Sequence, residues 1–192
     1  MTRQVLFVCA QNICRSPLMA SVFEAQIGPG ASVWTVSSAG TEASPGRRAC
    51  RYAVAVIPPA LGHLSTPLTN DALDAADLVV AASLAERSSI VRMSPSARSR
   101  TFTLREALLL GEQPIVSAES LAAYAETLDS RRGTLDLPTR RSLPWQRQPE
   151  HPLDVADVHH LGARTHRKAL ERAADDTREL ALRLTRALAP DS

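Results

Sequence analysis

Aromatic residues are scarce in this sequence, and the long apolar runs of membrane proteins are missing. Phe, Trp and Tyr make up 4% of the residues, and they are not interleaved with basic residues as on nucleic-acid-binding surfaces. The formal net charge is only +2, too small to indicate nucleic acid or an anionic membrane as a partner. No apolar run approaches the roughly 20 residues that cross a bilayer. We therefore expect neither a nucleic-acid nor a membrane partner.

Cysteines are also few, and Cys9, Cys14 and Cys50 do not make a disulfide framework. The first apolar run, 5–10, is too short for a signal peptide, and polar residues follow it at once. Both features favour a cytoplasmic protein. The 192 residues, 44% of them apolar, suit one compact domain over residues 1–192.

Predicted strands alternate with predicted helices along much of the chain. The β-branched apolar run 5–8 indicates a strand buried on both faces, and a helix is predicted for 16–27 before glycines stop it. Other strands are expected at 32–38, 77–82 and 99–104, a short strand or turn at 61–68, and helices at 47–57, 85–93, 119–128 and 164–188. The alternation predicts an α/β fold, a single doubly wound domain whose central four-stranded parallel sheet is flanked by helices.

Residues 107–152 follow the pattern less well and are interpreted as a partly irregular insert. Four prolines interrupt its second half, and 131–150 holds five arginines against two acidic residues. A solvated flexible loop is the usual meaning of such a charge run, and a regulatory surface is the alternative.

The turn after the first strand carries the chemistry. It reads Cys9-Ala10-Gln11-Asn12-Ile13-Cys14-Arg15-Ser16 and lies between a buried strand and a helix. Backbone N–H groups in such a turn, with the helix N-terminus, can cradle a phosphate, and Arg15 can hold two of its oxygens. The positive electrostatic potential of these groups also favours the thiolate form of Cys9, to which Ser16 can donate a hydrogen bond. An inert, buried Cys9 is the competing interpretation.

Residues 8–17 resemble the signature of the low-molecular-weight protein tyrosine phosphatases. Later segments resemble that family's other landmarks in the same order: Ser37-Ser38-Ala39-Gly40-Thr41, His63-Leu64-Ser65-Thr66-Pro67-Leu68-Thr69 and Ala76-Asp77-Leu78-Val79-Val80. The resemblance implies that Cys9 attacks phosphorus and forms a cysteinyl-phosphate while Arg15 and the loop amides, from Ala10 to Ser16, bind the phosphoryl oxygens. It implies no metal and no other cofactor, and the sequence alone suggests no ligand cluster.

A general acid is implied late in the chain, where the family carries an Asp-Pro pair followed by aromatics. Asp157 falls on that position, and Asp154 is the alternative. An Asp that only caps the last helix is the competing interpretation. The sequence departs from the family in three ways: Gln11 replaces a glycine, Val158 replaces the proline, and His159 and His160 replace the aromatics. The two imidazoles either line the substrate pocket or are solvated.

Supporting roles are implied for Ser38 and His63, which match positions that brace the phosphate loop through Asn12. Cys14 follows Cys9 in the same loop, and a disulfide between them would protect the nucleophile from over-oxidation. Cys50 falls in a predicted helix, where packing is its expected role.

The expected activity is therefore hydrolysis of phosphotyrosine-type monoesters on a protein, for which a tyrosine kinase is one candidate substrate. Two alternatives stay open. The three departures favour a catalytically weak phosphotyrosine-binding module. Arsenate reduction, which uses the same loop, needs further cysteines, and Cys14 and Cys50 are the only candidates.

Overall fold

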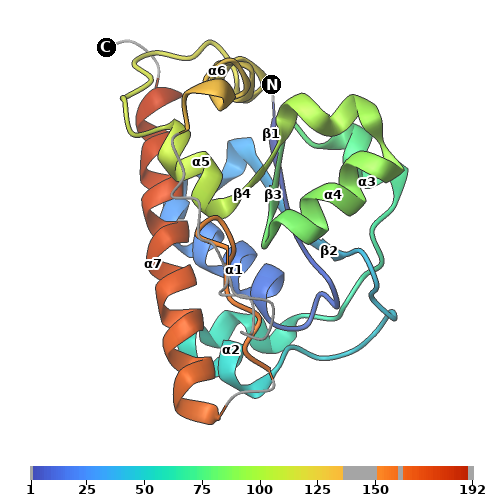
Figure 1. Cartoon of the computed structure of the whole chain (residues 1–192). Helices are drawn as coiled ribbons and strands as arrows, with labels where there is room; N and C mark the ends of the chain where they lie inside the picture. Colours follow the sequence, from blue (N-terminus) through green and yellow to red (C-terminus); the bar gives the residue numbers. More distant parts are fainter. Residues whose placement is uncertain (1, 136–150, 160–161, 190–192) are drawn as a thin grey trace.

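The computed structural model of the chain describes residues 2–135, 151–159 and 162–189 (Figure 1). Four parallel strands form one sheet in the order β2-β1-β3-β4. The strands are β1 (Arg3–Cys9), β2 (Trp34–Gly40), β3 (Leu78–Ala81) and β4 (Thr101–Thr103). The α-helices are α1 (Arg15–Ile27), α2 (Arg51–Val56), α3 (Asn70–Ala75), α4 (Leu84–Met93), α5 (Leu104–Leu110), α6 (Leu121–Ser130) and α7 (Ala163–Ala187). The predicted doubly wound α/β fold is confirmed.

Helices cover both faces of the sheet because successive side chains of a strand point in opposite directions. Val5 and Phe7 of β1 join the larger core cluster, with α1, α5, α6 and α7. Leu6 and Val8 join a second cluster with residues of α3 and α4. Figure 1 shows α1 and α7 on one side of the strands and α3 and α4 on the other. A continuous apolar run was therefore the correct signal for a central strand.

Helix α1 begins and ends close to the expected positions. It runs from Arg15 to Ile27 and ends where Gly28 adopts a positive φ of 52°. Glycine tolerates this backbone conformation, so the break at residues 28–30 follows from residue type. At the other end, β1 stops at Cys9 and α1 begins at Arg15, so the turn between them holds only residues 10–14.

One predicted helix begins later in the structure than expected. The helix expected at 47–57 begins only at Arg51, because residues 47–50 are extended and Arg48 pairs with Leu64 in an isolated bridge. Cys50 is the N-cap of α2, where its sulfur accepts a hydrogen bond from the backbone N–H of Ala53. The expectation that Cys50 lies inside a helix was wrong, and its thiol faces the loop region instead.

The segment 107–152 is partly integrated into the domain. Helix α6 was predicted nearly in place, and Tyr124 and Leu128 on its inner face are buried in the larger core. Arg132 donates to the carbonyl of Thr101 and lies over the ring of Phe102. Residues 136–150, which hold most of the arginine-rich stretch, lie outside the described residues. Within the described part of the chain, no helix combines the length and apolarity that crossing a membrane requires.

Candidate active site

The turn after β1 curls around the sulfur of Cys9. Cys9 is the last residue of β1, is 2% exposed, and its Sγ lies 3.0 Å from Ser16 Oγ at the start of α1. The carbonyl groups of the turn are bonded outward: Ala10 O to Glu42 N, Ile13 O to Cys50 N, and Asn12 O to His63 Nε2. Because these carbonyls face away, the N–H groups of the same turn are free to line an anion site.

Asn12 organises the turn from its centre. Its φ of 51° is in the left-handed region, which asparagine tolerates better than most residues. Its side-chain amide donates to Ser16 Oγ and to Ser38 Oγ, both at 2.9 Å, and its Oδ1 accepts from Thr66 N at 2.7 Å. His63 Nε2 bonds the Asn12 carbonyl at 2.7 Å. Ser38 and His63 thus both contact Asn12, as the resemblance implied.

Gly40, at the end of β2, leaves space for the turn. It pairs with Cys9 in the sheet, and a Cβ at this position would lie 2.6 Å from Ala10 O and 2.9 Å from Asn12 N. Both distances are below van der Waals contact. Only glycine fits here without displacing the backbone of the turn.

Arg15 is held between two carboxylates. One of its terminal nitrogens lies 3.0 Å from Glu86 Oε1 and 2.9 Å from Asp157 Oδ2, and its own side chain is only 7% exposed. Burial opposes the charge, but Glu86, Cys9 and Asp157 outweigh it and raise the Arg15 pKa above its ordinary value. Arg15 is therefore a fixed cation at the edge of the turn. Sequence reasoning missed Glu86, which comes from α4, 71 residues further along the chain.

The two candidate acids occupy different places. Asp157 Oδ2 reaches Arg15, and its side chain is 52% exposed. Asp154 Oδ1 instead accepts a hydrogen bond from the backbone N–H of Leu84 at the start of α4. The backbone N–H of Val155 donates to the carbonyl of Ala82, the residue after β3. This bond anchors the segment that holds Asp154 and Asp157. The geometry brings Asp157, and not Asp154, to Arg15.

A cavity of about 280 Å³ opens in front of the turn. Its described lining residues are Cys9, Ala10, Gln11, Ile13, Cys14, Arg15, Arg47, Asp157 and His159. Gln11 points to Arg47, and the two side chains share a hydrogen bond of 3.2 Å, so the residue that replaces a glycine does not fill the cavity from within. His159 is exposed and also lines the cavity, whereas His160 lies outside the described residues.

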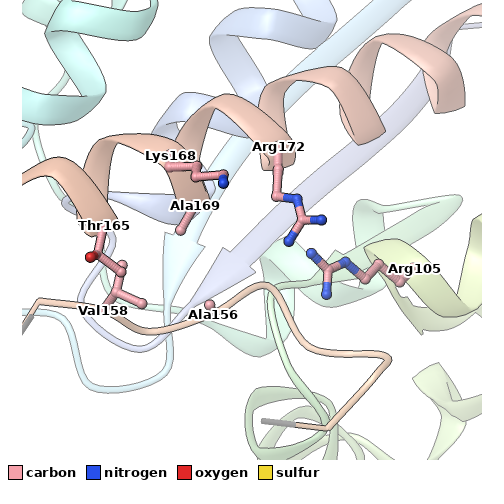
Figure 2. Close-up of a pocket in the computed structure, with 7 residues that line it drawn as sticks. All are labelled: Arg105, Ala156, Val158, Thr165, Lys168, Ala169 and Arg172. Atoms are coloured by element: carbon pink, nitrogen blue, oxygen red, sulfur yellow. The ribbon is translucent and has the colours of Figure 1, made fainter.

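A second cavity lies on another side of the acid segment (Figure 2). Ala156 and Val158 line it, and Figure 2 shows the guanidinium groups of Arg105 and Arg172 facing one another from α5 and α7. Among the described residues that line it, none is a cysteine or a carboxylic acid. Although it is larger, at about 430 Å³, it lacks the groups that phosphate-ester chemistry requires. Val158 is 4% exposed, so this replacement for proline is packed into the protein.

Cys14 lines the cavity in front of the turn, and its sulfur has two polar neighbours. Its sulfur lies 2.8 Å from Cys50 Sγ and 3.1 Å from His166 Nε2 of α7. The hydrogen bond with Cys14 lowers the pKa of Cys50 to about 6, and that bond together with burial raises the Cys14 pKa. Burial and the nearby His159 lower the His166 pKa. All three cysteines are unbonded thiols.

A thiol at a strand end, an anion-binding turn and a buried arginine within reach of a carboxylate are the parts from which cysteine-dependent phosphatases are built. On this doubly wound fold they define that class of enzyme. The sequence model of the low molecular weight phosphotyrosine protein phosphatases matches residues 4–109. The chain belongs to this family.

Similar proteins extend the match beyond those residues. A protein-arginine-phosphatase of Bacillus subtilis is 30% identical over 136 residues, which cover 69% of this chain and 83% of that protein. A crystal structure of a YwlE mutant from the same species superposes with a TM-score of 0.67 at 24% identity, covering 96% of this chain and 99% of the other. The crystal structure of the tyrosine phosphatase Wzb from Escherichia coli K30 superposes with a TM-score of 0.63 at 18% identity. This match covers 96% of this chain and 99% of the Wzb chain. The two structural matches establish the fold.

Proposed function

We propose that this phosphatase hydrolyses phosphotyrosine on protein substrates, with Cys9 as nucleophile, Arg15 as phosphate ligand and Asp157 as general acid. The observation that carries the proposal is the ion pair of 2.9 Å between Arg15 and Asp157 directly beside the Cys9 turn. It brings the acid to the group that would hold the phosphate. The expected cytoplasmic location stays a prediction from the sequence.

In the first proposed step, the Cys9 thiolate attacks phosphorus. Asp157 takes up a proton from the solvent after phosphate has displaced its carboxylate from Arg15. A sulfur–phosphorus bond forms while the bond from phosphorus to the phenolic oxygen breaks, and Asp157 gives this proton to that oxygen. Ser16, 3.0 Å from the sulfur, stabilises the thiolate. Arg15 and the N–H groups of residues 10–16 hold the phosphoryl oxygens as their charge grows.

In the second step, water attacks the cysteinyl-phosphate. Asp157, now a carboxylate, accepts a proton from the water, and the Cys9 thiolate leaves as phosphate is released. Asp157 is paired with Arg15 in the resting protein, so an incoming phosphate must replace the carboxylate on the guanidinium. The exposed position of Asp157 permits this exchange, while Glu86 stays with Arg15.

The choice of phosphotyrosine is supported by the cavity walls. Ile13 gives an apolar surface on which a phenyl ring can lie, and Arg47 adds positive charge to the rim. Among the described lining residues, Asp157 is the one carboxylate, and it is already paired with Arg15. Phosphate binding to Arg15 frees this carboxylate, which must then serve as the general acid. A guanidinium leaving group, as on phosphoarginine, would meet Arg47 on the rim, with Asp157 as its only acidic partner among the described lining residues.

The mechanism is tested by hydrolysis of p-nitrophenyl phosphate with no added metal. We expect turnover by the wild type, none by Cys9→Ser, and a decrease on the order of 10²–10⁴-fold in Asp157→Ala from lost proton transfer. Vanadate should still bind the Asp157 variant. A wild type that binds vanadate under reducing conditions but releases no product would instead establish the binding-module alternative.

Selectivity is tested with matched phosphotyrosine and phosphoarginine peptides. We expect a higher kcat/KM for the phosphotyrosine peptide than for the phosphoarginine peptide. Arg47→Ala should reduce the ratio of the two kcat/KM values, because it removes a cation from the rim of the cavity. Arg48→Ala, a neighbouring exposed arginine outside the cavity lining, is the control and should leave the ratio unchanged. A higher kcat/KM for phosphoarginine would overturn the phosphotyrosine assignment and leave the phosphatase mechanism standing.

A further inference from the structure

Four soft ligand groups meet beside the phosphate loop, and the proposed hydrolysis uses none of these side chains chemically. They are Cys14, Cys50, His159 and His166, and one potential ligand atom from each lies within 4.8 Å of those of the other three. The residues come from separate segments: the loop itself, the N-cap of α2, the acid segment and the first turns of α7. Such convergence is not explained by sequence proximity.

The cluster is built rather than incidental. Cys14 and His166 are 3% and 2% exposed, and their Sγ and Nε2 atoms face one another at 3.1 Å. The ring of Tyr52 packs on His166 with centroids 4.6 Å apart, and His159 meets the same imidazole edge-on at 4.5 Å. The aromatic neighbours hold the imidazole of His166 so that its Nε2 points at the sulfur.

The ligand types identify the ion class. Two sulfurs and two imidazoles are the donor set of four-coordinate zinc sites, whereas hard cations such as Mg²⁺ prefer oxygen. With Zn–S bonds of about 2.3 Å, two sulfurs of a tetrahedron lie roughly 3.8 Å apart. The observed sulfur separation is 2.8 Å, so the half-buried thiol of Cys50 has to move outward by about 1 Å to close the site.

We propose that Cys14, Cys50, His159 and His166 form a binding site for a thiophilic divalent cation of the zinc class. Two thiols lose their protons to the solvent as the ion binds, and the two histidines bind through neutral nitrogens. No electron is transferred.

The position of the site gives the ion a consequence for the proposed hydrolysis, on which this part rests. His159 lies two residues after Asp157, and Cys14 lies within the phosphate loop. An ion bound to both would tie the acid segment to the loop and restrict the exchange of Asp157 for phosphate on Arg15. Zinc should therefore lower kcat in the wild type.

Binding is tested on the full, fully reduced chain by equilibrium dialysis against Zn²⁺ and measurement of metal per protein. We expect one ion per chain, and at least 100-fold weaker binding in Cys50→Ser and in His166→Gln. Substitution with Co²⁺ should give a thiolate-to-metal charge-transfer band. At one Co²⁺ per chain, this band should be absent in both variants because they bind the ion too weakly. Cys9→Ser is the matched control, because Cys9 lies outside the cluster, and it should bind zinc as the wild type does.

Three results would overturn the proposal. One is the absence of stoichiometric zinc binding by the reduced protein. Another is binding that is lost in Cys9→Ser but kept in Cys50→Ser, which would place the ion on the nucleophile. The last is recovery of Cys14 and Cys50 only as a disulfide in reduced, zinc-treated samples.

Because Cys50 is half-exposed, its serine variant should fold, which a thermal melt without zinc checks. Failure of p-nitrophenyl phosphate hydrolysis would not affect the metal measurement.

Discussion

Arg15 lies between two carboxylates that differ in their surroundings. The Glu86 side chain is 7% exposed and is also bonded to Ser83, whereas the Asp157 side chain is 52% exposed. Breaking a buried ion pair leaves an uncompensated charge, and water compensates an exposed carboxylate at little cost. Glu86 is thus suited to hold Arg15 permanently, and Asp157 to leave it when phosphate arrives.

Replacement of Glu86 by glutamine tests this division. The change removes one charge from the buried pair, and we expect loss of stability of about 1–3 kcal/mol, as for a hydrogen bond to a charged group. We also expect vanadate affinity and kcat/KM to decrease by roughly tenfold or more, because a misplaced Arg15 holds phosphate less well. Thermal unfolding and vanadate inhibition measure the two effects.

The control is Glu106→Gln. Glu106 is buried like Glu86, but it is paired with Arg87 and Arg132 and not with Arg15. The Glu106→Gln substitution should lower the stability of the protein and leave its vanadate affinity unchanged. If the two variants lose vanadate affinity equally, Glu86 has no special role in positioning Arg15.

Gly40 gives a second prediction at the residue scale. Gly40→Ala places a methyl group 2.6 Å from Ala10 O, so the turn has to shift. A displacement near 1 Å can cost on the order of 10²-fold in rate, which kcat/KM on p-nitrophenyl phosphate would reveal. Gly62→Ala, where a Cβ meets nothing within 4 Å, should be silent. Wild-type rates in Gly40→Ala would contradict the tight packing described here.

Residues of the site differ in how far the sequence could reveal them. Cys9, Arg15 and Ser16 were predictable because one short turn holds them. Glu86 contacts Arg15 across 71 residues, and His166 contacts Cys14 across 152, so neither pair leaves a local pattern. Asp157 was found through the resemblance alone, since its spacing from Arg15 carries no signal of contact.

Short elements were the weakest part of the prediction from sequence. The helices α3 and α5 are six and seven residues long, too short for a clear 3.6-residue period. The sequence did contain a start signal for α5, because Thr103 and Glu106 form a capping box. The central strands β1 and β3 were easier to identify, since burial on both faces makes them continuously apolar.

Helix α6 tests whether the segment after α5 belongs to the domain core. Leu128 is fully buried, so Leu128→Ala should destabilise the protein by about 2–5 kcal/mol. Val116, in the same segment, is 84% exposed, and Val116→Ala should change stability by no more than about 0.5 kcal/mol. Urea unfolding measures both. Equal, small effects would mean that α6 is peripheral.

At the scale of the whole molecule, the site is built from segments near the start, the middle and the end of the chain. Arg15 directly follows the turn after β1, and its side chain contacts Glu86 in α4 and both Val155 and Asp157 in the segment before α7. A ligand that binds there should therefore stabilise the entire domain and not one element.

Vanadate should accordingly raise the unfolding temperature of the wild type. A ligand at 100 times its dissociation constant adds about 2.7 kcal/mol to stability when only the folded state binds it. Arg15→Ala should abolish most of the shift, which scanning calorimetry at several vanadate concentrations can follow. No shift in the wild type would mean that the turn does not bind an oxyanion.

The distance in sequence between Arg15 and Asp157 has a consequence for the protein during its synthesis. The two residues are 142 positions apart, so the ribosome makes the turn with the proposed nucleophile long before the proposed acid. At about 5–20 residues per second, the delay is on the order of ten seconds. Helix α7, which packs over α1 and carries the histidine beside Cys14, is made later still. A nascent chain thus carries its reactive thiol before it can complete a catalytic cycle.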